Sequence, residues 1–493
     1  MATPPPRNPV AAFLHNFSLA EFSDEEKRFV ARTRVSQFLS SLNFNISSAS
    51  ALDMYMRHSG GSSTTMAVHY GTVQSSINLC NMLLAPAVGC LSDTIGRKPL
   101  MMFGRAGWAL WWLVLANIDA LSAATGLTQL GIRMLGEIVC WGIIQAGTWS
   151  AYTAAQADYF GTRPALMGKV GTTGGIVWDL GQFGGSIVGA WLAVASPKLS
   201  LYASAACALG TIVLFSTLKE PLAKDKRKPF RLLEANPIGS LGLLFSYGSG
   251  LKRLTAMTSL LYTQYDTWSV RNSYRLGAVG LSSSAISLLN TWAAACMMFS
   301  QGAIVIPLTQ ARGFPFAFKV GAIGGIIAYA MEGTSWIGAT ARTRLIHYVL
   351  AQTVYSGIFE ICGHCIRPMV TKQGIQASKK IQQQALADGR PDPGQVGLGA
   401  LSAAVNNLSS LLGVVSPIAW AWTYSFFDKG NPSAKALAAG ARQNHWLFRW
   451  GKGGHLFIAA ALLLLSAGVL HTAPKREMYL DEEDDKGKEG EGA

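Results

Sequence analysis

Apolar residues occur along this chain in long runs that are separated by short polar connections. A helix needs about 20 mostly apolar residues to cross the core of a bilayer, and twelve stretches of the chain approach that length. These stretches are 36–56, 68–91, 100–119, 128–150, 170–195, 199–218, 254–273, 284–307, 317–339, 345–367, 398–424 and 455–472. The pattern predicts an all-α membrane protein with twelve transmembrane helices.

Two of the twelve runs are unusually polar. Asn43, Asn45 and several serines dilute the first run, and Gln264 and Asp266 lie in the seventh. Polar side chains are costly where they face lipid. We therefore expect these two helices to face the interior of a bundle or a wet cavity.

The polar connections divide the chain into two sets of six helices. The connection at 219–253 is the longest in the first two thirds of the chain and is strongly basic, and two later polar insertions lie at 368–397 and 425–454. The expected organisation is a tail at 1–35, a six-helix bundle at 36–218, a cytoplasmic basic linker at 219–253, a second six-helix bundle at 254–472 and an acidic, disordered tail at 473–493.

Composition and charge support a membrane protein and suggest its orientation. Of 493 residues, 14% are charged and 50% are apolar, which argues against a disordered chain and against a soluble enzyme. With the N-terminus inside the cell, inner segments hold 28 of the 41 Lys and Arg, outer loops hold 11, and Arg105 and Arg133 lie within helices. Because these residues concentrate in cytoplasmic loops, we expect both termini in the cytoplasm. The net charge of +14 then needs no nucleic-acid partner.

The connection between the second and third runs carries a spaced motif. It reads Gly-x-Leu-x-Asp-x-x-Gly-Arg-Lys from Gly89 to Lys98. Glycine permits a tight turn, and Asp93 can cap a helix and pair with a basic neighbour. A generic basic turn would account for Arg97 and Lys98, but it would not account for the spacing of the glycines and the aspartate.

This motif resembles the signature between helices two and three of the major facilitator superfamily. The matching residues are Gly89, Leu91, Asp93, Gly96, Arg97 and Lys98, and the chain departs from the signature at Thr94. The resemblance implies two pseudo-symmetric six-helix bundles around a central cavity. It also implies that the two bundles rock against each other, so that the cavity opens alternately to either side of the membrane. It also implies that Asp93, Arg97 and Lys98 gate the cytoplasmic side.

Further segments look like other parts of the same family. Arg133 resembles a buried arginine of helix four, and Asp158 and Arg163 look like the connection between helices four and five. The segments 236–241 and 397–417 look like the tetracycline-resistance-like branch, although helix five lacks the proline typical of drug–proton antiporters. The glycines of that helix suit close helix contacts; they are Gly171, Gly174, Gly175, Gly184, Gly185 and Gly189.

Several acidic residues fall within the predicted helices. They are Asp53, Glu137, Asp179, Asp266 and Glu360, and His364 follows Glu360 by one helical turn. One hypothesis is that such a group binds and releases a proton during transport. The alternative is structural: Glu137 pairs with Arg133, and Asp53 lies at a solvated helix end. Asp266 and Glu360 are the better candidates for proton transfer.

Aromatic residues lie near these acids, among them Trp141, Trp149, Tyr355 and Phe359. They either line a cavity for a partly apolar solute or serve helix packing, and packing is favoured for most. The predicted function is secondary transport of a small organic solute, coupled to protons, by a monomer in a lipid bilayer. The alternative is a transporter-like sensor. No phosphate-binding loop or clustered catalytic set occurs in the sequence, so we expect no ATP-driven pump, no enzyme, no cofactor and no metal.

Overall fold

The computed structural model describes residues 17–160, 163–227, 229–230, 239–246, 248–388, 398–430 and 451–472. The expected tail at 473–493, part of the segment 236–241, and parts of both later insertions lie outside these residues. Every regular element within the described residues is helical, as the sequence predicts.

The first half of the chain forms one set of helices. They are α2 (Asp24–Ile46), α3 (Ser48–His58), α4 (Ser63–Ile95), α5 (Arg97–Ala116), α6 (Ile118–Thr125), α7 (Gln129–Glu137), η1 (Ile138–Ile144), α8 (Thr148–Phe160), α9 (Pro164–Ala195) and α10 (Pro197–Ser216). Since α2 continues into α3, α5 into α6 and α7 into η1 and α8, the set amounts to six long helical segments.

The second half repeats this plan. Its helices are α11 (Gly239–Ser246), α12 (Gly248–Tyr265), α13 (Trp268–Tyr274), η4 (Arg275–Val279), α14 (Ser283–Ser300), η5 (Gln301–Val305), α15 (Ile306–Thr334), α16 (Ala341–Val354), η7 (Tyr355–Phe359), α17 (Ile361–Ala387), α18 (Leu398–Gly430) and α20 (Gly454–His471). Gly313, with φ of 74°, divides α15 into the end of one segment and the whole of the next. Short 3-10 turns lie at Lys224–Lys226 and Ser335–Ile337.

Local sequence sets where many of these helices begin. Ser23 and Glu26 form a capping box at the start of α2, in which each side chain bonds to the other residue's backbone. Ser62, Thr128 and Ser282 cap the starts of α4, α7 and α14 with their side-chain oxygens. The short connections between helices are therefore encoded locally.

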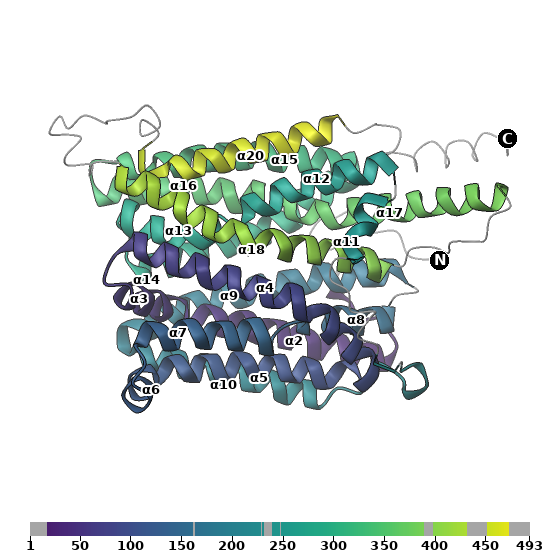
Figure 1. The fold of residues 1–493 in the computed structure, drawn as a ribbon, viewed down its shortest axis with the longest axis horizontal. Coiled ribbons are helices and arrows are strands. Elements are labelled where there is room, and N and C mark those ends of the chain that lie inside the picture. Colours follow the sequence, from purple (N-terminus) through teal and green to yellow (C-terminus); the bar gives the residue numbers. More distant parts are fainter. Residues whose placement is uncertain are drawn as a thin grey trace.

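The two halves meet along two pairs of helices. The second segment of the first half, α4, packs along the fifth segment of the second half, α18, and α9 packs along α14 in the reciprocal arrangement. Figure 1 shows the first half mostly below and the second half mostly above, with α4 and α18 between them. This reciprocity is what two pseudo-symmetric six-helix bundles require, so the predicted fold is confirmed.

Nine helical stretches among the described residues are long and apolar enough to span a membrane. The three predicted segments outside this set are α2–α3, α9 and α12–α13, which carry buried polar residues. Asn43 and Gln264 are fully buried, and Asn45 and Asp179 are nearly so. The expectation that the polar first and seventh runs face the bundle interior is therefore confirmed for Asn43, Asn45 and Gln264.

The seventh segment is longer than the sequence predicts. Arg275 lies beyond the predicted run 254–273 and Arg271 lies near its end, and both are counted among the outer Lys and Arg. In the structure Arg271 lies in α13 and Arg275 in η4, and both are buried. Partners inside the second half satisfy both guanidinium groups, which allows the helix to continue through them. Without these two arginines, the outer loops hold fewer Lys and Arg. The difference in Lys and Arg between the inner segments and the outer loops therefore increases.

The glycines of α9 produce a close helix contact. A Cβ atom at Gly181, Gly185 or Gly189 would stand within 2.8 Å of a backbone carbonyl oxygen of α2. Of the six glycines predicted to make close helix contacts, Gly185 and Gly189 thus meet the backbone of α2, and this contact lies within the first half. Between the halves, close approaches fall at Gly71 of α4 against Pro417, at Gly413 of α18 against Asn78 and at Gly277 of η4 against Ser63. No described atom lies within 4 Å of a Cβ at Gly171.

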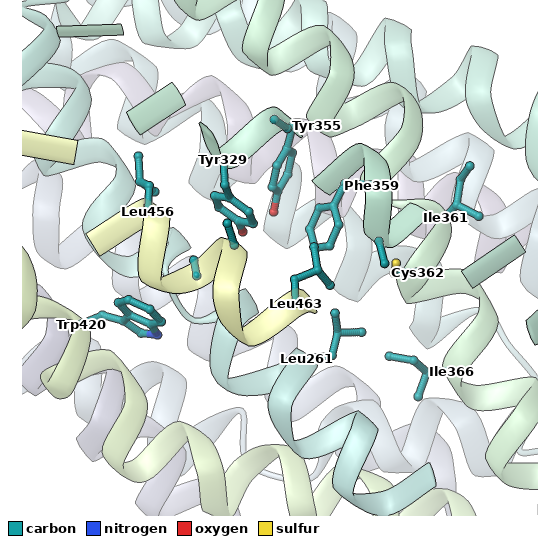
Figure 2. Packing of buried hydrophobic residues seen from close by; sticks show 14 of the residues in the cluster. Leu261, Tyr329, Tyr355, Phe359, Ile361, Cys362, Ile366, Trp420, Leu456 and Leu463 are labelled. Atoms are coloured by element: carbon teal, nitrogen blue, oxygen red, sulfur yellow. The ribbon is translucent and has the colours of Figure 1, made fainter. Parts of the chain in front are cut away.

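The largest hydrophobic cluster fills the second half. Figure 2 shows Tyr329 of α15, Tyr355 and Phe359 of η7 and Leu463 of α20 packed together. Tyr355 and Phe359 are buried, and their ring centroids lie 4.8 Å apart. These two aromatics therefore serve packing.

Candidate functional site

A cavity of about 580 Å³ lies where the two halves meet. Its walls come from α4, α5, η1, α8 and α10 of the first half and from α18 of the second. Because both halves contribute, a change in their relative position must change the shape of this cavity.

The cavity walls are partly polar and partly aromatic. Gln74, Asn81 and Gln145 contribute amides, and Trp141 and Trp149 contribute indole rings. Of the two roles considered for the aromatic residues, cavity lining and helix packing, these two tryptophans therefore have the first. Trp141 also stacks on Trp108, with 5.7 Å between ring centroids.

The spaced motif assembles into a charge cluster next to this cavity. Arg97 is buried and forms ion pairs with both Asp93 and Asp158, the latter at 3.1 Å from Nε. Gly89 and Asp93 line the cavity itself. A Cβ at Gly89 would meet no described atom within 4 Å, so Gly89 makes no close helix contact.

Glu220 completes the cluster and was not predicted as a site residue. Its carboxylate accepts hydrogen bonds from the backbone N–H groups of Arg97 at 2.7 Å and Lys98 at 3.1 Å. Gly96 has φ of 111°, and a Cβ there would overlap this carboxylate. An acid at a helix N-terminus is stabilising, and Lys98 Nζ donates to the carbonyl of Ser216 at 2.6 Å, so α5 and α10 are joined at this end.

Arg163 pairs with Glu26, another residue that the sequence analysis did not single out. Burial alone would raise the pKa of Glu26, but hydrogen bonds from the Ser23 backbone N–H and the Arg163 guanidinium lower the pKa below its usual value. Ion pairs Lys169–Glu21 and Lys219–Glu25 flank this contact. Ion pairs therefore join the connection between predicted helices four and five to the start of α2.

Arg133 and Glu137 lie next to each other, as expected if Glu137 has a structural role rather than a role in proton transfer. Arg133 Nε lies 4.0 Å from Glu137 Oε2, and its Nη1 donates to the carbonyl of Ala51 at 3.1 Å. The guanidinium carbon lies 4.0 Å from the centre of the Tyr55 ring. Arg133 is thus held by neighbours in the first half, while Glu137 Oε2 lies near it without a hydrogen bond from any described residue.

Three of the predicted acids accept hydrogen bonds from neutral groups. Asp53 accepts from Ser283 across the boundary between the halves, and Asp266 accepts from Ser416 within the second half. Asp179 accepts from Gln301 at 2.9 Å, again across the boundary. Asp53 is exposed, as the solvated alternative expects, and it also bonds to the other half.

Glu360 and His364 are less closely associated than one helical turn implies. Glu360 is half-buried at the junction of η7 and α17, whereas His364 is exposed. No ion pair joins them within the part of the chain that the structure describes. The π-helical turn Tyr355–Phe359 ends directly before Glu360, and His364 lies in α17.

The most buried ion pair was missed by the sequence analysis. Arg271 and Glu332 form a bidentate pair, with Nε to Oε1 at 2.7 Å, and are 6% and 1% exposed. Tyr348 donates to Glu332, while Arg275 Nε donates to Tyr348 at 2.7 Å. Glu332 lies inside the predicted apolar run 317–339. An acid within an apolar run was the feature of the sequence that could have identified it.

A family model described as Major Facilitator Superfamily matches residues 35–362, which is well over half of the chain. Together with the two reciprocal six-helix halves and the loop cluster, this match shows that the chain belongs to the Major Facilitator Superfamily. It is accordingly an integral, multi-pass membrane protein.

Individual proteins show the same relationship. The chain is 26% identical over 278 residues to the class G tetracycline resistance protein of Vibrio anguillarum, and the match covers 54% of this chain and 66% of that protein, just under two thirds. Two solved structures share the fold. They are the human organic anion transporter MFSD10 (TM-score 0.59, 18% identity, 91% of this chain and 100% of that chain) and a D-xylose–proton symporter (TM-score 0.65, 15% identity, 92% and 99%).

Proposed function

We propose that this chain is a secondary active transporter that moves a small organic solute across a membrane by alternating access. The observation that carries the proposal is the cavity of about 580 Å³ with walls from both halves. Its volume is within the usual range for small-molecule sites. Family membership supports the same reading, and since one chain supplies both halves, a monomer suffices.

The contacts between the halves suggest which way the cavity opens. At the end where α3 is followed by α4, Asp53 bonds to Ser283 and Thr64 donates to Asp428 at 2.9 Å. Toward the middle, Asn78 donates to the carbonyl of Gly413 at 2.8 Å. The cavity lies toward the opposite end, beside Asp93. We infer that the halves are closed at the Asp53 end and that the cavity serves the Asp93 end.

The distribution of Lys and Arg supports a cytoplasmic position for the Asp93 end and for both termini. Epitope tags at the two termini test this orientation in intact cells. Antibody access to either tag is expected only after the membrane is permeabilised. Staining of a terminal tag without permeabilisation would overturn the orientation.

Proton coupling is part of the proposal, with Asp179, Asp266 and Glu360 as candidates. Asp179 and Asp266 accept from neutral groups, and none of the three has an ion-pair partner among the described residues. A proton can bind to such an acid without breaking an ion pair. Glu137 and Glu332, in contrast, are held by arginines.

Flux through vesicles tests the whole proposal. Comparison of metabolites in cells with and without the gene identifies the solute, whose uptake is then measured against pH in vesicles that contain the purified chain. Asp266→Asn and Glu360→Gln are expected to reduce flux and flatten its pH dependence, while the exposed Asp119→Asn leaves both unchanged. Unaltered rates and profiles in both variants would exclude these two acids as proton carriers.

The sensor alternative gives a different result in the same vesicles. A chain that lacks residues 481–493 is expected to keep its flux if transport is the function. Binding of the solute without any flux, by the full chain as well as by the shortened one, would identify a sensor instead.

A further inference from the structure

Arg105 is a buried cation in the middle of α5. Its side chain is 8% exposed. The guanidinium carbon lies 4.2 Å from the centre of the Trp108 ring and 5.9 Å from that of Phe215. These ring contacts fix the plane of the guanidinium, but they supply no counter-charge and no hydrogen-bond acceptor in that plane.

The other buried arginines have polar partners. Arg97 has two carboxylates, Arg133 has Glu137 and a carbonyl, and Arg271 has Glu332. Arg275 donates to Tyr348 at 2.7 Å and to Gln352 at 2.8 Å. Arg105 forms no hydrogen bond and no ion pair with any residue that the structure describes. A guanidinium without acceptors is costly to keep in such a position.

Arg105 faces the cavity between the halves. It is the sole cationic side chain among the described residues that line the cavity. Asp93 is the sole acid there, and Asp93 is already paired with Arg97. Among the described residues, the cavity therefore presents one cation, Arg105, that forms no ion pair.

Resting on the transport function proposed above, we propose that Arg105 is the binding residue for the anionic group of the solute, which is an organic monoanion with a carboxylate. The planar guanidinium fork matches a carboxylate through two parallel hydrogen bonds. One unbalanced charge in the cavity corresponds to one negative charge on the solute. Trp141, Trp149 and Phe215 provide apolar surface for the rest of the molecule, and Gln145 provides an amide.

The first test uses the unaltered protein and needs no transport assay. Purified full-length chain is titrated with carboxylates and their uncharged amides in matched pairs: naphthoate and naphthamide, benzoate and benzamide, hexanoate and hexanamide. Binding is followed by the shift in thermal unfolding and by tryptophan fluorescence, to which Trp108 and Trp141 are close reporters. At least one carboxylate is expected to bind about ten-fold or more tightly than its amide. If no pair differs in this way, the proposal is wrong.

The second test assigns the selectivity to Arg105. Arg105→Gln is expected to weaken carboxylate binding about ten-fold or more while amide binding stays within about two-fold. Arg105→Lys keeps the charge but loses the fork, so an intermediate affinity is expected. Arg312→Gln removes one charge from an exposed position outside the cavity wall and is the matched control.

Two outcomes separate this inference from the proposed function. Selective carboxylate binding that depends on Arg105, without flux, would support the anion site and refute transport. Flux of a neutral or cationic solute that is unaffected by Arg105→Gln would support transport and overturn the anion site. Should Arg105→Gln fail to fold, the matched pairs on the unaltered protein and the Arg105→Lys variant still decide the question.

Discussion

Arg271 in the second half and Arg105 in the first half are both buried arginines on transmembrane helices, and their surroundings differ completely. Arg271 meets Glu332 in a bidentate pair inside the largest hydrophobic cluster, and Tyr348 also bonds to that carboxylate. Arg105 meets two aromatic rings and the cavity. The comparison teaches that burial alone does not distinguish a structural charge from one available to a ligand. The presence or absence of acceptors does.

The largest expected effect comes from breaking the paired site. Arg271→Gln leaves the Glu332 carboxylate buried without its counter-ion, which typically costs about 3–5 kcal/mol. A marked fall in the thermal unfolding temperature of the detergent-purified protein is expected. Lys27→Gln, which removes a cation from an exposed pair with Asp24, is the control and should change stability by about 1 kcal/mol or less.

The double variant Arg271→Gln with Glu332→Gln sharpens this prediction. It removes both charges, so it should be more stable than Arg271→Gln alone. An Arg271→Gln protein as stable as the Lys27→Gln protein would show that the pair does not hold the second half together.

The unpaired site is expected to respond in the opposite direction. Arg105→Leu removes a buried charge that lacks acceptors, while it also loses the ring contact with Trp108. The first contribution should exceed the second, so that stability without ligand rises by about 1 kcal/mol. Thermal unfolding of the ligand-free protein measures this change, and a fall as large as that of Arg271→Gln would mean that Arg105 has a structural role.

The smallest expected effect lies at the edge of the first half, where Glu26 pairs with Arg163. The native structure lowers the pKa of Glu26 from its reference value of 4.5. The stability that this carboxylate contributes is therefore present above about pH 4.5 and is lost as the pH falls through the lower native pKa. Below pH 4.5, unfolding temperatures of the unaltered protein should fall more steeply than those of Glu26→Gln. The expected difference is about 1 kcal/mol or less, and parallel curves would contradict the assignment.

The sequence carries the information for the fold and for contacts that are local along the chain. Twelve apolar runs predict the helices, and the spacing of Arg133 and Glu137 predicts their proximity because one turn of helix separates them. Asp93 and Arg97 are also close along the chain, but they lie on either side of the turn at Gly96, which joins α4 to α5. Both contacts are local along the chain.

Contacts between distant segments were less accessible. Asp179 and Gln301 lie 122 positions apart, and their hydrogen bond depends on how α9 packs along α14. Arg275 lies beyond the predicted run 254–273 because polar residues end an apolar run, although a partner on another helix, Tyr348, allows the helix to continue. The π-helical turns before Glu360 and around Trp141 have no sequence pattern that announces them.

The contact between α2 and α9 has a consequence for how a solute reaches the cavity. Gly181, Gly185 and Gly189 bring the backbones of the two helices together so closely that a single methyl group would meet a carbonyl oxygen. An acyl chain is wider than a methyl group, so lipid cannot enter this seam. The seam between α2 and α9 therefore offers no passage for a solute, whichever side the solute approaches from.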